Sequence, residues 1–427
     1  MRLQLFFSFI IIMCGSSFGQ IKHKFLVLVE NRDTLLYVDE VNPANNWVVS
    51  LKPYGKNNDI QLVGNNHVMV SFQNGFGTHP VDKGGFCEFD LANKGKLVRD
   101  CLGTTPAGHE TSCQRLLNGH TRLFRNNWDS TPTPITCYEF DTSGIAAVKK
   151  PDQWQWTDGT VPCIGSRMVR QTVEGTYLFG TTNTDAGYLC EGDTTGKVLN
   201  KIKVPGVATG NTGSIYKGIR LQNGNYIVSC GFAKNILELK PDGSVVRTLD
   251  GTVTPTGSTV SIGQYFYGCF QILGNGNIVL CNWRGHNDEP DAHGYAMLEY
   301  DTNGKVVWYW HDAADKYSCH KVLVLDSVDT RYICYDVYGQ LTRIDGSATG
   351  AIKPADKAGP RAALASCQAR WDGISPVVVP AGARGFVAYS MLGEKLGKFS
   401  VGPGERVLHS IPFSKIGNQI VQIEFIK

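Results

Sequence analysis

The chain has 427 residues, of which 42% are hydrophobic and 19% are charged. That hydrophobic share excludes an intrinsically disordered chain, and the length fits one large repeat domain with an appendage. The 41 basic and 38 acidic residues leave a net charge of +3, which offers no basic stripe for nucleic acid. The 48 glycines have no collagen period, so they predict many tight turns and therefore many short strands.

Residues 1–19 have the pattern of an export signal. Arg2 supplies the basic start, residues 5–13 are apolar apart from Ser8, and small residues follow as far as Gly19. The apolar run is too short to span a membrane, so cleavage after Gly19 would leave a soluble or surface-attached chain that begins at Gln20. We therefore expect a secreted protein, located outside the cell or on the outer-membrane surface.

The cysteine count points to the same compartment. The chain has 13 cysteines, and removal of Cys14 with the signal leaves an even number. An even number in an exported chain favours disulfides, although the spacing does not determine which cysteines pair. No CxxC pair occurs, which argues against a zinc ribbon. Buried thiols are the alternative, because cysteine packs well in sheet cores.

A degenerate repeat occupies residues 20–346. One unit runs from Tyr267 to Cys281 as strand, Asn-Gly turn and strand, and continues from Tyr295 to Trp310 as a second hairpin. Alternating apolar residues predict buried strands, and Asn-Gly or Asp-Gly accepts the positive φ of hairpin turns. The same order recurs at residues 59–99, 111–149, 166–203, 215–247 and 318–346, and residues 23–51 fit the last three strands of a unit.

These units predict a β-propeller. Four short strands form a small sheet that cannot bury both faces alone, and a ring of such sheets solves this problem. The period of about 40–50 residues is that of a propeller blade. The seven units therefore predict an all-β fold with seven blades over residues 20–346. Six blades follow instead if residues 23–51 and 318–346 share one blade.

The blade sequences carry a family resemblance. The strand Asn-Gly-Asn-Ile-Val at 275–279, followed by Leu-Glu-Tyr-Asp-Thr-Asn-Gly-Lys-Val-Val-Trp at 298–308, resembles the blades of PQQ-like and arylsulfotransferase-type propellers. The resemblance covers roughly residues 23–346 and implies the architecture, but no single activity, because propellers host many functions. The regular tryptophan docking motifs of quinoprotein dehydrogenases are absent, so we expect no PQQ and no other organic cofactor.

The C-terminal part departs from the repeat. Residues 347–365 read as a linker, and residues 366–427 predict a small immunoglobulin-like β-sandwich with strands within 385–396 and 417–426. This segment resembles the C-terminal sorting domains that route exported proteins to the surface in some Gram-negative bacteria, as in type IX secretion. The resemblance implies the secretion machinery as a partner, and a plain accessory sandwich is the alternative. We expect the protein to be a monomer.

Propeller function usually resides in the loops around one end of the central channel. The loops that lead into the innermost strands contribute His109, Glu110, Arg167, Tyr216, Lys217, Tyr265, Tyr267 and His320. The loops between second and third strands contribute His79, Arg125, Trp128, Trp283, Arg284, His286, Asp288, Glu289, Asp291 and His293.

Three of these residues are candidates for catalysis. His320 and His109 each open an innermost strand, where an imidazole facing the channel would act as a general acid–base or as a nucleophile. Tyr267 opens the corresponding strand of another unit and is the third candidate. The alternative for each histidine is a hydrogen-bonded residue of the core.

A second group is expected to bind the ligand. Arg125 and Arg284 open corresponding loops, and two guanidinium groups there would suit a carboxylate or a sulfate. Salt bridges at the surface are the alternative. The remaining candidates offer ring faces that suit sugars, with packing between blades as the alternative. They are Tyr216, Trp128, Trp283 and His286.

The long loop at 281–294 is the candidate metal site. It combines His286 and His293 with Asp288 and Asp291, which are ligands that divalent metals accept. The spacing does not match an EF-hand loop. The alternative is a polar loop over the channel mouth.

Three functions are consistent with these patterns. The leading one is a secreted or surface-attached propeller that binds an extracellular polysaccharide or a small anionic ligand. The second is an enzyme acting on an anionic substrate, as a polysaccharide lyase or hydrolase or a sulfotransferase, through His320 or His109 with the two arginines and Tyr267. The third is a structural surface protein with a plugged channel. Placement of His320, Tyr267 and Arg284 around one pocket would favour the enzyme, whereas their burial in blade cores would favour the binding protein.

Overall fold

The computed structural model describes most of the repeat region and part of the C-terminal segment. The described ranges are 21–74, 83–103, 109–126, 134–144, 154–159, 161–163, 166–181, 187–207, 215–250, 263–285, 295–310, 317–344, 368–371, 377–378, 385–390, 395–400, 407–408 and 421–426. The predicted export signal at 1–19 and the linker at 347–365 lie outside these ranges. No helix within them is long and apolar enough to cross a membrane.

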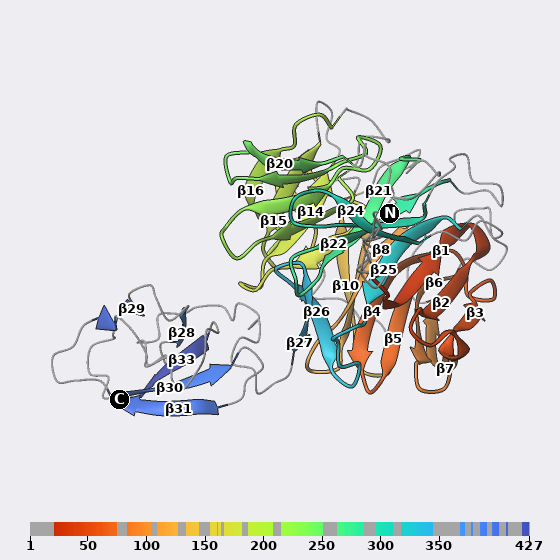
Figure 1. Ribbon diagram of the computed structural model, residues 1–427. Coiled ribbons are helices and arrows are strands. Elements are labelled where there is room, and N and C mark those ends of the chain that lie inside the picture. The colour runs from red at the N-terminus through yellow and green to blue at the C-terminus, as the bar shows by residue number, and fades with distance from the viewer. Residues whose placement is uncertain are drawn as a thin grey trace, which may run out of the picture.

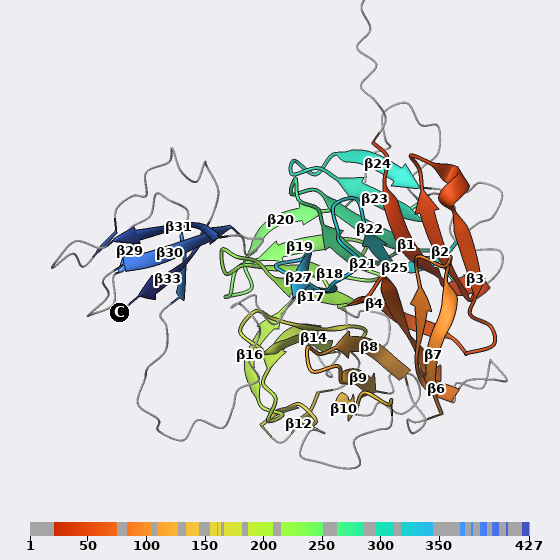
Figure 2. The ribbon, with the colours of Figure 1, turned by 90° about the horizontal axis from the view of Figure 1, so that it is seen from below.

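Short antiparallel sheets are arranged as a ring, as Figure 2 shows, and we call the region enclosed by their innermost strands the central channel. The first three blades in the chain are β4 Asn57–Gly64, β5 His67–Asn74, β6 Lys83–Asp90 and β7 Lys96–Leu102; β8 His109–Arg115, β9 Thr121–Asn126 and β10 Thr136–Phe140; and β13 Val169–Gln171, β14 Tyr177–Thr181, β15 Tyr188–Gly192 and β16 Val198–Lys203. The next two are β17 Lys217–Arg220, β18 Tyr226–Ser229, β19 Ile236–Leu239 and β20 Val245–Leu249; and β21 Phe266–Ile272, β22 Ile278–Trp283, β23 Met297–Tyr300 and β24 Val306–Trp310. Small elements between these strands are β11 Thr157–Asp158 and β12 Val161–Pro162.

The sixth blade closes the ring with strands from both ends of the repeat region. Its innermost strand is β25 Cys319–Val324, which pairs with β1 Lys24–Val29, followed outward by β2 Thr34–Asp39 and β3 Trp47–Ser50. The short 3-10 turns η1 Glu30–Arg32 and η2 Pro43–Asn45 connect these outer strands. Residues 23–51 and 318–324 therefore share one blade. The prediction of seven blades is wrong, and the described residues form six, because two incomplete units complete each other and leave no unpaired inner edge.

The second half of the expected seventh unit forms a separate hairpin. Strands β26 Ile333–Val337 and β27 Gln340–Ile344 pair with each other, and β26 touches the innermost strand β4 through Ile333 and Val63. The Tyr335 hydroxyl donates to the carbonyl of Arg115 on β8, and the carbonyl of Gly339 accepts from Ile272 on β21, 2.9 Å away. All three contacts lie at the ends of innermost strands. The hairpin thus reaches three blades at one end of the channel, and Figure 1 shows β26 and β27 beside β4.

The Asn-Gly turns are one residue longer than a two-residue hairpin. The pair Ile272–Ile278 closes β21 on β22, and the Leu273 amide bonds to the Asn277 carbonyl at 2.8 Å, which leaves a three-residue loop. Gly276 has a φ of 85° there, the left-handed position that this loop type requires. The predicted positive φ is confirmed, and the extra residue sets the register of the strands.

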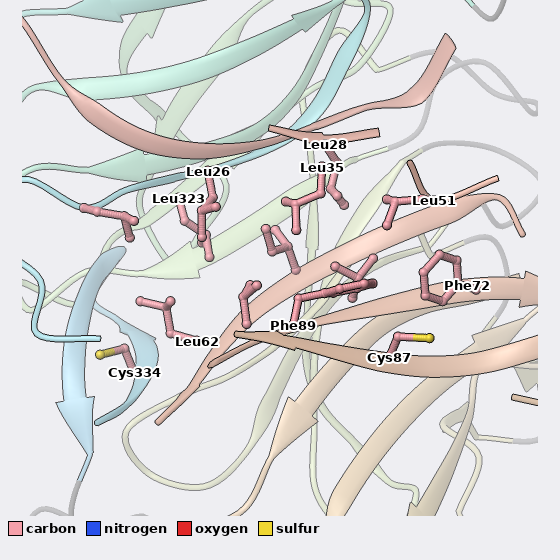
Figure 3. Packing of buried hydrophobic residues seen from close by; sticks show 14 residues of the cluster. Leu26, Leu28, Leu35, Leu51, Leu62, Phe72, Cys87, Phe89, Leu323 and Cys334 are labelled. Carbon is pink, nitrogen blue, oxygen red and sulfur yellow. The ribbon is translucent and has the colours of Figure 1, made fainter. Parts of the chain in front are cut away.

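Aliphatic and aromatic side chains fill the space between neighbouring blades. Figure 3 shows the cluster between the closing blade and the blade of β4, where Leu26, Leu62, Phe72 and Phe89 are buried. Eleven cysteines in the described residues are buried thiols, so the disulfides favoured by the even count are not confirmed, and these cysteines have the alternative state. Cysteine acts in these cores as a small apolar side chain.

Glutamines on innermost strands tie one blade to the next. Gln61 Oε1 accepts the amide of Arg115, 2.6 Å away, and Gln271 bonds both the amide and the carbonyl of Val324, at 2.9 and 3.1 Å. Gln61 lies in the second half of β4, and Gln271 is the next-to-last residue of β21. A buried amide that satisfies backbone groups of the neighbouring blade replaces water that is excluded there.

The C-terminal segment contains two small sheets. One has the order β28 Gln368–Trp371, β33 Val421–Ile426, β30 Gly385–Ser390 and β31 Lys395–Ser400, and the other pairs β29 Val377–Val378 with β32 Val407–Leu408. Strands β30 and β33 fall where the alternation predicts them. An immunoglobulin-like sandwich with a sorting role stays a prediction.

Candidate functional site

Bulges shape the channel wall near the start of several innermost strands. The pairing register shifts at residues 57–59 of β4, at 110–112 of β8 and at 267–270 of β21, and again between Cys319 and Lys321 of β25. Each bulge breaks the strict alternation of the strand and re-aims a side chain. Asp59 and Lys321 are charged residues within otherwise apolar strands, and each lies at one of these bulges.

Four charged side chains form a buried network in the channel. Arg170 Nη2 lies 2.9 Å from Asp59 Oδ1, and Arg170 Nε lies 2.7 Å from Asp336 Oδ2 on the hairpin. Lys217 Nζ lies 3.1 Å from the same Asp336 oxygen and donates to the carbonyl of Phe270, 2.6 Å away. Four elements therefore meet through two carboxylates and two cations.

The network keeps its acid ionised. Burial by itself raises the pKa of Asp59, but the charge and hydrogen bonds of Arg170 and the Cys113 amide outweigh it, so the pKa of Asp59 is lowered. Arg170 in turn has its pKa raised, because the two carboxylates outweigh the cost of its burial. A buried ion pair persists only when its lone pairs are satisfied in this way.

A second cluster lies at the other end of the channel, where the innermost strands begin. We call it the mouth cluster, and it consists of Glu30, Lys56, Tyr216, Trp283 and His320. Lys56 Nζ lies 2.7 Å from Glu30 Oε1, while Trp283 Nε1–H donates to Glu30 Oε2 and His320 Nδ1 is 3.5 Å from that oxygen. The rings of Trp283 and His320 stack with centroids 5.1 Å apart at 18°, and Tyr216 packs 5.8 Å from His320.

A cavity of about 40 Å³ lies between the hairpin and the walls of β4, β8 and β13. Its lining includes Gln61, Gln114, Arg170, Tyr335 and Asp336. A polar cavity of this size has room for a few ordered waters. Gln114 Oε1 has no hydrogen-bond partner among the residues that the structure describes.

The structure separates the candidates for catalysis. His320 lies in the mouth cluster, with 13% of its side chain exposed. Tyr267 lies in the core between the blades of β17 and β21, its hydroxyl 2.8 Å from that of Tyr300, and burial raises the pKa of Tyr267 strongly. His109 begins β8, and the position of its side chain lies outside the described residues.

The two candidate arginines are engaged by the protein itself. Arg284 is buried, and its Nε donates to the carbonyl of Tyr317, 2.9 Å away. Burial also lowers the pKa of Arg284. Arg125 lies over the ring of Tyr138, with 5.9 Å between the guanidinium carbon and the centroid. The predicted pair of anion-binding guanidinium groups therefore stays a prediction, and both side chains have structural contacts.

Several other candidates lie outside the described residues. They are Trp128, His286, Asp288, Asp291 and His293. Among the residues that the structure does describe, no group of His, Cys, Asp and Glu is placed to hold a metal ion.

Sequence reasoning missed most charged residues of the channel. Glu30, Lys56, Asp59, Arg170 and Lys321 were not among the candidates, nor was Asp336. Asp59, Arg170, Lys321 and Asp336 lie in strands, and their signal is a single charge inside an apolar run, as in Asp-Ile-Gln-Leu at 59–62 and His-Lys-Val-Leu at 320–323. Such a charge is costly to bury, so it indicates a paired or functional group.

Comparison with known proteins supports the fold. No protein-family profile matches the chain, and no curated protein matches it. A protein of unknown function from Bacteroides caccae is similar with a TM-score of 0.52 and 19% identity, over 71% of this chain and 99% of that one. An alcohol dehydrogenase-like quinoprotein from Bacteroides thetaiotaomicron is similar at 0.39 and 13%, over 71% and 66%. A virginiamycin B lyase from Staphylococcus aureus is similar at 0.38 and 8%, over 70% and 88%.

At these identities the similarity is one of fold and carries no activity. The strand order and the Bacteroides caccae structure agree on the architecture. The repeat region of this chain is an all-β propeller whose described residues form six blades.

Proposed function

We propose that the protein is an exported propeller that binds an extracellular polysaccharide at the mouth cluster. The observation that supports this most directly is the stack of Trp283 on His320 beside the ion pair of Lys56 and Glu30. An aromatic face next to charged hydrogen-bonding groups is the combination that sugar rings require. The predicted export signal and the sorting-like C-terminal segment support a ligand outside the cell.

The burial of the mouth cluster limits the kind of contact. Lys56 has 20% of its side chain exposed and His320 13%, and the other members are more buried. A ligand would contact mainly the partly exposed side chains of Lys56 and His320, because Trp283 offers little exposed ring surface. We therefore expect the terminal sugar of a polysaccharide to bind, with the rest of the chain outside the channel.

The test is a binding screen of the purified mature chain against polysaccharides, with matched tryptophan variants. Trp283→Ala should weaken binding by on the order of tenfold or more, because a ring face and its support for His320 are lost. Trp47→Ala is the control, since Trp47 stacks on Tyr37 in the outer strands of the closing blade. Equal binding by the Trp283→Ala variant and the native chain would contradict the assignment.

An enzyme is the second candidate, and one observation favours it. His320 Nδ1 lies 3.5 Å from Glu30 Oε2, so the carboxylate is placed to orient the imidazole as a general base. Tyr267 and Arg284 were predicted to act together with His320, but both side chains are buried away from solvent. Release of product from polysaccharides or aryl sulfates should then be lost in both His320→Ala and Glu30→Gln. Full turnover by His320→Ala would rule out this mechanism.

A further inference from the structure

The cavity beside the β26–β27 hairpin combines apolar walls with a few polar groups. Ile60 and Leu62 of β4, Leu323 of β25 and Leu341 of the hairpin contribute aliphatic side chains to its lining. The cavity has a volume of about 40 Å³ and is partly open to solvent. A concave site with apolar walls and a small number of polar groups is the form that small-molecule sites take.

The charged groups at this cavity balance one another. Arg170 pairs with Asp59 and with Asp336, and Lys217 pairs with the same Asp336. Two cations therefore face two carboxylates in one network. A charged ligand would have to replace one of these buried ion pairs, which is costly, so the cavity favours a neutral molecule.

Gln114 on β8 gives the cavity a hydrogen-bond acceptor. Only 8% of this residue is exposed, and its Nε2 donates to Gln171 Oε1, 2.5 Å away. Its Oε1 has no hydrogen-bond partner among the described residues, and the neighbouring Tyr335 hydroxyl donates its proton to the carbonyl of Arg115 instead. A buried carbonyl oxygen is costly to leave unsatisfied, so a ligand that satisfies it must carry a hydrogen-bond donor.

We propose that this cavity binds a small neutral alcohol, whose hydroxyl donates to Gln114 Oε1 while its carbon atoms lie against Ile60, Leu62 and Leu341. The volume corresponds to about three water positions, so a ligand of roughly three or four non-hydrogen atoms fits. A ligand of that size binds with a Kd on the order of millimolar. The site lies at the opposite end of the channel from the mouth cluster, and the inference does not depend on polysaccharide binding there.

The experiment compares propan-2-ol with acetone in titrations of the purified mature chain, followed by saturation-transfer NMR. The two molecules share a carbon skeleton, and only the alcohol donates a hydrogen bond. Propan-2-ol should bind about tenfold more tightly than acetone, because only the alcohol satisfies Gln114 Oε1. Binding of neither molecule, or equal binding of both, would overturn the proposal and leave ordered water as the occupant of the cavity.

Three variants assign the binding to this cavity. Gln114→Met keeps the length of the side chain without its acceptor, so propan-2-ol should bind about tenfold more weakly and acetone as before, which also shows that the cavity is intact. Leu341→Trp should fill the cavity and remove binding of both molecules. Gln155→Met is the matched control, since Gln155 is exposed and bonds Thr136 Oγ1, and it should change neither Kd.

The variants also give the result that contradicts the assignment. If propan-2-ol binds the Gln114→Met and Leu341→Trp variants as tightly as the native chain, the alcohol binds elsewhere and the proposal is wrong. The polysaccharide screen is a separate measurement, so failure of either proposal leaves the other standing.

Discussion

Arg170 on β13 and Asp336 on the β26–β27 hairpin are 166 residues apart and form an ion pair with 2.7 Å between Nε and Oδ2. The same carboxylate accepts from Lys217 on the next blade. One aspartate therefore attaches the hairpin to two blades and forms ion pairs with two cations. Because of these two ion pairs, the hairpin is a structural part of the fold at this end of the channel.

Removal of this carboxylate should destabilise the protein. Asp336→Asn leaves Arg170 and Lys217 without a shared counter-charge, and we expect a loss of about 3 kcal/mol in the free energy of unfolding. Chemical denaturation measures this value, and limited proteolysis should cut the hairpin first. Asp329→Asn is the control, since Asp329 pairs with Arg331 at the exposed surface and should change stability little. Equal stability of the two variants would show that the hairpin does not depend on Asp336.

The ring closure should respond to pH through His23. Its Nε2 lies 2.7 Å from Glu299 Oε2 and its Nδ1 2.5 Å from Asp326 Oδ2, which joins the start of β1 to β23 and to the end of β25. Burial alone would lower the pKa of His23, but the hydrogen bonds to Asp326 and Glu299 outweigh it and raise the pKa to about 9.

Because the folded pKa of His23 exceeds its ordinary value of 6.5, protonated His23 stabilises the fold fully below pH 6.5, and this contribution is lost as pH rises through about 9. His23→Gln should lower the Tm by several degrees below pH 6.5, and the difference from the native chain should shrink toward pH 9. Asp326→Asn should show the same trend. A difference in Tm that is constant across this range would contradict the assignment.

The glutamine link between blades should also contribute to stability. Gln271→Ala leaves the amide and the carbonyl of Val324 without their partners in a buried place, which should cost about 2–3 kcal/mol in the free energy of unfolding. Gln340→Ala provides a comparison, because that exposed side chain makes one bond of 3.3 Å to Leu273. If both variants unfold at the same denaturant concentration, the hydrogen bonds between Gln271 and Val324 do not contribute to the free energy of unfolding as expected.

Cys163 and Cys190 are the pair of thiols that we expect to form a disulfide on oxidation. Both are buried in the same core cluster, and the interaction with Cys190 lowers the pKa of Cys163. Diamide should accept the two electrons and two protons that joining these sulfurs releases, and peptide mapping without reductant should recover the crosslink. Cys230 bonds a backbone carbonyl and should stay reduced. A different dominant crosslink, or none, would contradict this expectation.

Much of the blade architecture was predictable because its signals are local. The alternation in residues 267–281 and the positive φ of Gly276 depend on neighbours in the chain, and both agree with the structure. Register was less predictable. A three-residue turn after Leu273 and the bulge at 267–270 each shift the pairing by a residue, and neither is visible as a hydrophobic pattern.

The candidate site was only partly predictable. His320, Trp283 and Tyr216 were found because repeat alignment places loop residues at one end of the channel, and the structure brings these three together. Tyr267 was misplaced by the same reasoning, since the bulge after it changes the face to which a strand residue points. Glu30 was missed because it comes from the opposite end of the chain and reaches the mouth through ring closure.

The amino-acid sequence, which is rich in glycine and low in charge, was enough to predict an all-β protein of short strands and tight turns. Turn residues and the alternation of apolar residues act over only a few positions, so they can be read from the sequence alone. Only the tertiary structure settled the number of blades, through the pairing of β25 with β1 from the far end of the repeat. It also settled the role of the few internal charges. Asp59, Arg170, Lys217 and Asp336 are distant in sequence and meet because a charge taken out of bulk water requires a partner.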